Sequence, residues 1–168
     1  MKVDRSMVTK LMITDVPNLD PVAVFLEDYR PGWVKITIEC YGQAWSHFWG
    51  GKGEKSGTEF FCGCDNHYLC GKLAPGLKST IIDDDRLEVF AKRTVIRRRR
   101  EDGCTKAEAR ELYDKAKTID RSDAELMYDV FGDEWWEQGP KVPNYRWEYL
   151  CRILDAAKAG VATLKTAN

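Results

Sequence analysis

The stretch Val34-Lys35-Ile36-Thr37-Ile38-Glu39-Cys40-Tyr41 alternates apolar residues with polar or amphipathic ones. Because successive side chains of a β-strand point to opposite faces, its four apolar side chains share one face and the others share the opposite face. This alternation predicts a strand of an antiparallel sheet that has one face on a core and the other in solvent.

The residues on both sides of this stretch predict three more strands. Val22–Glu27 also alternates, and Pro31-Gly32 suits a type II turn, because proline fixes φ and glycine accepts a positive φ. Thr9–Val16 is rich in β-forming residues, and the chain returns as Ala44–Trp49 after a turn at Gly42-Gln43. The sequence therefore predicts a four-stranded antiparallel meander.

The remainder of the chain predicts helices. Thr105 and Ser122 are each followed three residues later by a glutamate, which is the capping-box pattern of a helix N-terminus. The predicted helices are Thr58–Leu73, Asp84–Arg100, Thr105–Thr118, a short helix from Ser122 to about Gly132, and a last helix that Asn144 caps. We therefore expect an α+β fold, with an N-terminal four-stranded antiparallel meander packed against about five C-terminal helices.

The 168 residues suit one ordinary domain, so we expect a single domain over residues 1–168. Residues 1–6 are expected to be a flexible extension, which leaves Met1 and Met7 both open as the native start. The glycine-rich residues 50–57 are expected to connect the sheet to the helical part. With 26 basic and 27 acidic residues the chain is not basic overall, but a local basic patch stays possible.

The sequence predicts a cytoplasmic protein with no membrane partner. No apolar run approaches the about 18 residues that a membrane span needs, and the first residues lack the apolar core of a signal peptide. Because disulfide frameworks belong mainly to small secreted chains, we expect the six cysteines to be reduced thiols.

Cys62, Cys64, His67 and Cys70 place three thiols and an imidazole within nine residues. Four such ligands can hold zinc in a tetrahedron. The spacing differs from a Cys-x2-Cys knuckle, and on a helix Cys62 and Cys64 point about 200° apart. We favour a helix packed on the sheet and keep a small structural zinc site as an alternative. No other metal and no cofactor is expected.

Arg97, Arg98, Arg99 and Arg100, with Arg93 one turn earlier, form a basic cluster on the predicted helix 86–100. Arginine binds phosphate well because its planar fork matches two oxygens, and with the following Gly103 turn and helix the segment resembles a helix-turn-helix. This pattern predicts nucleic-acid binding. In the alternative interpretation the arginines only match the helix dipole and form a solvated face.

Four tryptophans are candidate contacts for a partner protein. Trp45 and Trp49 fall on one face of the fourth predicted strand, and Trp135 and Trp136 lie in an acidic loop. Exposed aromatic rings mark contact surfaces because they bury much area at low entropic cost. In the alternative interpretation these rings fill the core between the sheet and the helices.

We expect no catalytic residues. The two histidines, His47 and His67, belong to no nucleophile or metalloprotease signature. Asp83-Asp84-Asp85 suits the start of a helix better than a divalent-ion site. The sequence therefore predicts a protein that is not an enzyme.

Four segments together resemble a family of small accessory proteins encoded by temperate phages and prophages, and the resemblance runs from about Met7 to near the C-terminus. The segments are Lys35–Gly42, Phe60–Leu69, Gly132–Trp136 and Tyr149–Ile153. The resemblance implies a class of role, because short phage accessory proteins commonly modulate host machinery, block defences such as CRISPR or restriction, or assist phage DNA metabolism.

The function predicted first is therefore non-catalytic binding of a host or phage protein, with an anti-defence role. The first alternative is nucleic-acid binding through the arginine-rich helix 86–100 and the helix that follows it, and the second is a structural zinc site. The partner and the oligomeric state stay open.

Overall fold

The computed structural model describes residues 1–3, 5, 7–51 and 53–165. Asp4 and Ser6 of the predicted extension and Lys52 of the predicted connector lie outside the described residues. The chain forms two compact units, with Met1–Lys78 and Tyr145–Asn168 in unit 1 and Ser79–Asn144 in unit 2. The single domain expected over residues 1–168 stays a prediction.

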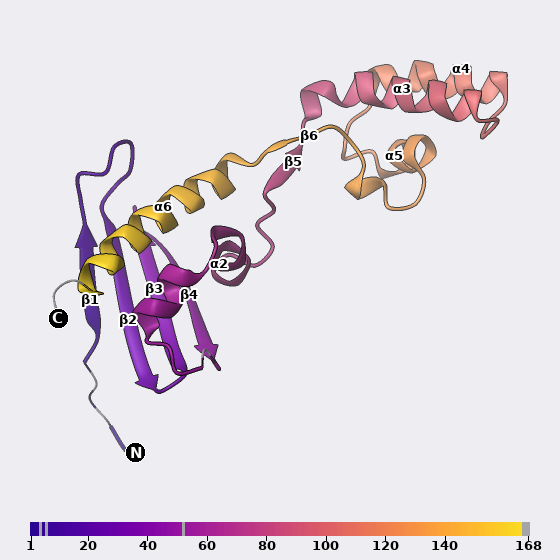
Figure 1. The fold of residues 1–168 in the computed structure, drawn as a ribbon. Helices are drawn as coiled ribbons and strands as arrows, with labels where there is room; N and C mark the ends of the chain where they lie inside the picture. The colour runs from indigo at the N-terminus through magenta and orange to yellow at the C-terminus, as the bar shows by residue number, and fades with distance from the viewer. Residues whose placement is uncertain (4, 6, 52, 166–168) are drawn as a thin grey trace. The chain divides into compact units, whose positions relative to one another are not determined.

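Unit 1 is built on a four-stranded antiparallel sheet with the order β1-β2-β3-β4 (Figure 1). Its strands are β1 (Thr9–Ile13), β2 (Val22–Arg30), β3 (Trp33–Cys40) and β4 (Gln43–Gly50). The predicted meander is confirmed. The last turn is one residue earlier than predicted, because Tyr41 and Gly42 both adopt positive φ, of 48° and 73°. That pair makes the two-residue turn whose twist matches an antiparallel hairpin.

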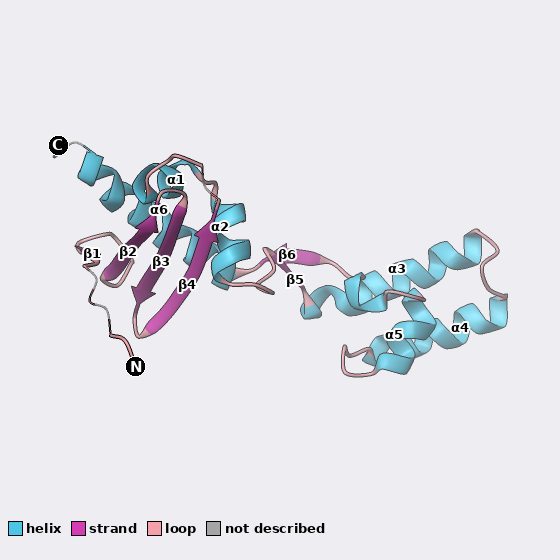
Figure 2. Ribbon diagram, turned by 90° about the horizontal axis from the view of Figure 1, so that it is seen from below, coloured by secondary structure: helices cyan, strands magenta, loops and turns pink. Residues whose placement is uncertain are grey.

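Three helices cover one face of this sheet, as Figure 2 shows: α1 (Gly57–Gly63), α2 (Asn66–Leu73) and α6 (Tyr145–Ala162). The face they cover is the one that the alternation of β3 predicts, since Val34, Ile36 and Ile38 are fully buried. The short helix η4 (Thr163–Lys165) follows α6. Together the sheet and these helices enclose one continuous apolar core.

The predicted helix Thr58–Leu73 is in fact two helices. Cys64 is extended, with φ −82° and ψ 143°, and the Asp65 side chain accepts a hydrogen bond from the backbone of Tyr68 as the N-cap of α2. The cap of α1 is a capping box of Ser56 and Glu59 rather than Thr58. In the described chain there are therefore six α-helices rather than about five.

Unit 2 begins and ends with the two strands of a small antiparallel sheet, β5 (Thr80–Ile82) and β6 (Lys141–Pro143), which the sequence did not predict. Between them lie α-helices that pack on one another around two small apolar clusters. The elements are η1 (Asp84–Arg86), α3 (Leu87–Arg100), α4 (Lys106–Lys115), η2 (Ala116–Thr118), α5 (Ala124–Phe131) and η3 (Trp135–Glu137).

Candidate nucleic-acid interface

The helices α3 and α4 run side by side as a hairpin (Figures 1 and 2). The short connection between α3 and α4 allows the two helices to form a hairpin. Asp102 adopts a positive φ of 54°, and the backbone of Gly103 donates a 2.8 Å hydrogen bond to the carbonyl of Arg98. A Cβ at position 103 would lie 3.2 Å from the same carbonyl oxygen, so a side chain fits poorly there. The arrangement is an αα-hairpin, not the crossed pair of a helix-turn-helix.

The N-terminus of α4 is fixed by the predicted capping box. The Thr105 hydroxyl accepts a 3.2 Å hydrogen bond from the backbone of Glu108, and the Glu108 carboxylate accepts a 2.7 Å bond from the backbone of Thr105. These bonds hold the pKa of Glu108 below its ordinary value, with the backbone bond as the largest cause. The end of the hairpin is thus locally well defined.

Arg98 has a structural role, unlike its neighbours in the cluster. Its Nη1 donates to the carbonyl of Val130 at 3.0 Å and to that of Asp129. Both carbonyls belong to the last turn of α5, where backbone acceptors lack partners within the helix. Arg98 therefore joins α3 to the C-terminal end of α5, where a cation is also favoured by the helix dipole.

The other predicted arginines are exposed. Arg99 pairs with Asp102 at 3.4 Å, and such a surface pair contributes little free energy. Arg93, Arg97 and Arg100 have the i, i+4, i+7 spacing that places side chains along one side of a helix. In the part of the chain that the structure describes, the side chains of these three arginines form no hydrogen bond or ion pair.

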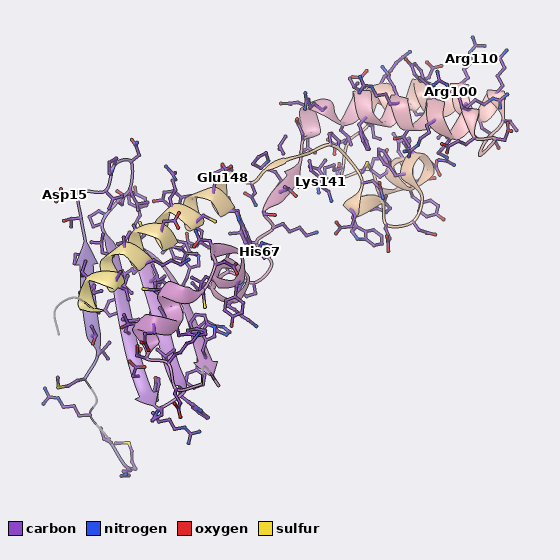
Figure 3. The ribbon with its side chains drawn as sticks, viewed as in Figure 1. Asp15, His67, Arg100, Arg110, Lys141 and Glu148 are labelled. Atoms are coloured by element: carbon purple, nitrogen blue, oxygen red, sulfur yellow. The ribbon has the colours of Figure 1, made fainter. Side chains whose placement is uncertain are left out.

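Two cations of α4 extend this surface. Lys106 and Arg110 are exposed, and Figure 3 places Arg100 and Arg110 at the same end of the hairpin. A hollow of about 490 Å³ between α3 and α4 is lined by Ile96, Arg100, Lys106, Arg110, Tyr113 and the acidic Asp114, among others. A second hollow beside it is lined by Arg93, Ile96, Arg97, Arg100 and the acidic Glu101. We call this surface the basic groove. It comprises six cations, two carboxylates and four other residues, namely Arg93, Val95, Ile96, Arg97, Arg99, Arg100, Glu101, Lys106, Ala109, Arg110, Tyr113 and Asp114.

The charge of unit 2 is strongly segregated. Residues 93–110 contain seven Lys or Arg and three Asp or Glu, whereas the rest of unit 2 contains six and thirteen. A chain that is nearly neutral as a whole therefore presents a locally cationic hairpin. Such local fields attract polyanions even when net charge does not.

The four candidate zinc ligands do not converge. The Cys62 thiol faces the carbonyl of Lys158 at 3.7 Å, the Cys70 and Cys151 sulfurs are 3.8 Å apart, and the His67 ring lies against Trp147. Burial, followed by the neighbouring Cys151, raises the pKa of Cys70 to about 12. Among the described residues no group of three or more His, Cys, Asp or Glu could hold a metal ion. Burial also raises the pKa of Cys64, so neither thiol readily becomes the thiolate that binds metals.

The four candidate tryptophans fall on different units. Trp49 is buried in the core of unit 1, where its indole N–H donates to the Tyr68 hydroxyl at 3.1 Å, so little of it is left for a partner. Trp45 lines a hollow of unit 1 that also contains aromatic side chains of α6. We call it the aromatic hollow; it measures about 1410 Å³ and its aromatic residues are Trp45, Tyr145, Trp147 and Tyr149.

Trp135 and Trp136 belong to unit 2, and their ring centroids are 6.0 Å apart. Trp135 is half-buried against the small apolar cluster around Leu87 and Met127, whereas Trp136 is exposed. Trp136 is thus the more accessible of the two to a partner.

Sequence reasoning missed two features. Lys106 and Arg110 were not named as candidate contacts, although the helix that contains them was included and their i, i+4 spacing after a capping box is a readable signal. On the sheet face opposite the helices, which we call the open sheet face, the rings of Tyr29, Trp33 and Phe48 are exposed and touch edge to face. In the sequence these three residues alternate with the apolar residues that face the core, and this alternation was the available signal.

The fold and this surface define a small α+β protein with a cationic two-helix hairpin. The chain belongs to a phage family: the family model Phage_phiTE_072, described as a phage family, matches residues 1–163. The predicted resemblance to phage proteins is thus confirmed. No curated protein and no solved structure matches the chain.

Among the described residues, no helix has both the length and the apolar composition that crossing a membrane requires. The cytoplasmic location and the absence of enzymatic activity stay predictions.

Proposed function

We propose that this phage protein is a non-catalytic protein that binds nucleic acid through the basic groove. The observation that carries the proposal is the exposure of five cations on one helical hairpin, which form no ion pair within the described chain. They are Arg93, Arg97, Arg100, Lys106 and Arg110.

Five cations without ion-pair partners on one hairpin favour a polyanionic ligand. Like charges on one surface repel each other, so an anion that bridges them is bound favourably. Arginine is the side chain best suited to phosphate oxygens, and neutralised phosphates release counterions from the nucleic acid. Because α3 and α4 form a hairpin and not a helix-turn-helix, the proposal requires phosphate contacts and no recognition helix in a major groove.

The proposal is tested by fluorescence anisotropy with a labelled oligonucleotide at several salt concentrations. For five phosphate contacts we expect the logarithm of affinity to fall against the logarithm of salt with a slope of about −4. The triple variant Arg97→Ala, Arg100→Ala, Arg110→Ala should lose at least about tenfold in affinity and reduce the slope to about −2.

A matched control removes the same charge elsewhere in unit 2. Arg86, Arg121 and Lys141 are exposed, and none of them lines the basic groove. Their triple alanine variant should bind within about twofold of wild type, because surface charges act mainly within a Debye length of about 10 Å. Equal losses in both variants, or no binding at low salt, would contradict the proposal.

A second candidate function is binding of a host or phage protein, which the aromatic hollow of unit 1 favours. Hollows lined by Trp and Tyr suit the anchor residues of protein partners. Capture from host lysate treated with nuclease should recover a specific protein, and Trp45→Ala should weaken that capture while Trp136→Ala should not. Recovery that depends on intact nucleic acid would instead favour the first candidate. An anti-defence role stays a prediction.

A further inference from the structure

The lining of the basic groove contains apolar side chains, which we call its floor, and cationic side chains, which we call its rim. Ile96 is 40% exposed and Tyr113 is 37% exposed, and both lie in the hollow between α3 and α4 with Ala109. Arg99, Arg100, Lys106 and Arg110 line the same hollow, and the single carboxylate of Asp114 leaves four cations to one anion there. Its volume of about 490 Å³ lies within the about 300–1,000 Å³ of typical ligand sites.

We infer that the basic groove takes unpaired nucleotides, with bases on the apolar floor and phosphates on the cationic rim. This inference rests on the proposed function and names its substrate class. The ligand that complements such a groove is an anion that also has an apolar face. A nucleotide of a single strand has both parts, because every base has a π-face next to a phosphate.

A duplex fits this groove less well. Its outer surface presents phosphates and sugars while its bases are stacked inside, so it leaves Ile96 and Tyr113 without an apolar partner. The hairpin also lacks the crossed helix that reaches base edges in the major groove. Unpaired bases therefore match the apolar floor better than a double helix does.

The Tyr113 ring contacts Lys92, and this contact favours its present orientation. The Lys92 ammonium lies 5.3 Å from the centroid of the ring, within the range of a cation–π contact. A ring that is fixed before binding loses less conformational entropy when a base stacks on it. Ile96 lines both hollows, so it lies where successive nucleotides would cross from one to the other.

The test compares three probes of equal length with the full-length protein: a single-stranded DNA, the same strand with abasic sites in place of bases, and the corresponding duplex. We expect the single strand to bind about tenfold more tightly than the abasic strand, the effect of about one stacked base. Both strands should show the same salt slope, since their phosphates are identical.

Two variants test whether the difference in affinity between the single strand and the abasic strand depends on the apolar floor of the groove. Tyr113→Ala should remove most of the preference over the abasic strand, and Tyr113→Phe should restore it, because stacking needs the ring and not the hydroxyl. Circular dichroism of each variant checks that the hairpin remains folded.

Equal binding of the single and abasic strands, or tighter binding of the duplex, would overturn the inference. The proposed function would survive that result if the triple arginine variant still lost binding. Efficient displacement of the strand by polyglutamate, at a concentration of charge similar to that of the DNA, would also overturn the inference and indicate an acidic protein ligand. If none of the three probes binds at low salt, both proposals fail.

Discussion

The two units of this protein differ in how much apolar surface they bury. In unit 1 seventeen buried residues form one cluster between the sheet and its three helices, whereas the two clusters of unit 2 contain five and three. Unit 2 instead presents charge, with its cations concentrated in residues 93–110. The comparison shows that unit 1 encloses the larger apolar core, whereas the cations of unit 2 are gathered on one hairpin.

The largest expected effect is on the core of unit 1. Phe61 is fully buried there, and Phe61→Ala should lower the free energy of unfolding by about 3–5 kcal/mol through lost burial and a cavity. Urea denaturation monitored by circular dichroism measures the change. If residues 1–168 form a single domain, the variant shows one cooperative transition; two separate transitions would contradict that prediction.

A smaller loss of stability is expected in unit 2 when Arg98 is replaced. Arg98→Ala removes the donor to the carbonyls of Asp129 and Val130 and should cost about 1–3 kcal/mol. Arg97→Ala, which removes an exposed arginine of the same helix, should leave the unfolding free energy within about 0.5 kcal/mol of wild type. Equal destabilisation by the two variants would show that Arg98 has no special structural role.

A substitution on the open sheet face of unit 1 tests whether this unit takes part in nucleic-acid binding. The Arg30 guanidinium lies 3.5 Å from the centroid of the Trp33 ring, and Phe48 lies 5.3 Å away. Trp33→Ala should cost only about 1 kcal/mol, because the ring is partly exposed, and should not change nucleic-acid affinity. A tenfold loss of affinity in this variant would mean that unit 1 takes part in binding.

The smallest expected effect concerns pH and the capping box of α4. The pKa of Glu108 is lowered in the folded protein, chiefly by its bond to the backbone of Thr105. Its contribution to stability is therefore complete above the ordinary glutamate pKa of 4.5 and is lost as the pH falls through the lowered value. Thermal melts of wild type and Glu108→Gln should differ at neutral pH and converge in acid. A difference that persists in acid would contradict this assignment.

The local features of the fold were predictable from the sequence. The alternation of Val34–Cys40 correctly predicted both the strand and its buried face, because period-two patterns report burial directly. The capping box at Thr105 was also correct. The one predicted at Ser122 was wrong, because Asp123 accepts the bond from Leu126 instead and begins α5 one residue later. Short caps of this kind compete with one another within a few residues.

The tertiary parts of the site were not predictable. Arg98 was grouped with the other arginines because its acceptors lie thirty-one and thirty-two residues later in α5, a distance that helix periodicity does not report. Lys106 and Arg110 join the groove only because the Gly103 turn folds α4 back along α3. Trp49 and Trp45 share one strand face, yet Trp49 is buried against Phe60 and Tyr68 whereas Trp45 lines a hollow.

The central claim is that unit 2 binds nucleic acid, and photo-crosslinking tests it most directly. Single-stranded DNA that contains bromouracil is irradiated with the full-length protein, and the crosslinked peptides are identified by mass spectrometry. The predicted crosslinks fall between Arg93 and Asp114, with Tyr113 as the principal aromatic site. Crosslinks confined to unit 1, at the aromatic hollow or at the open sheet face, would contradict the claim.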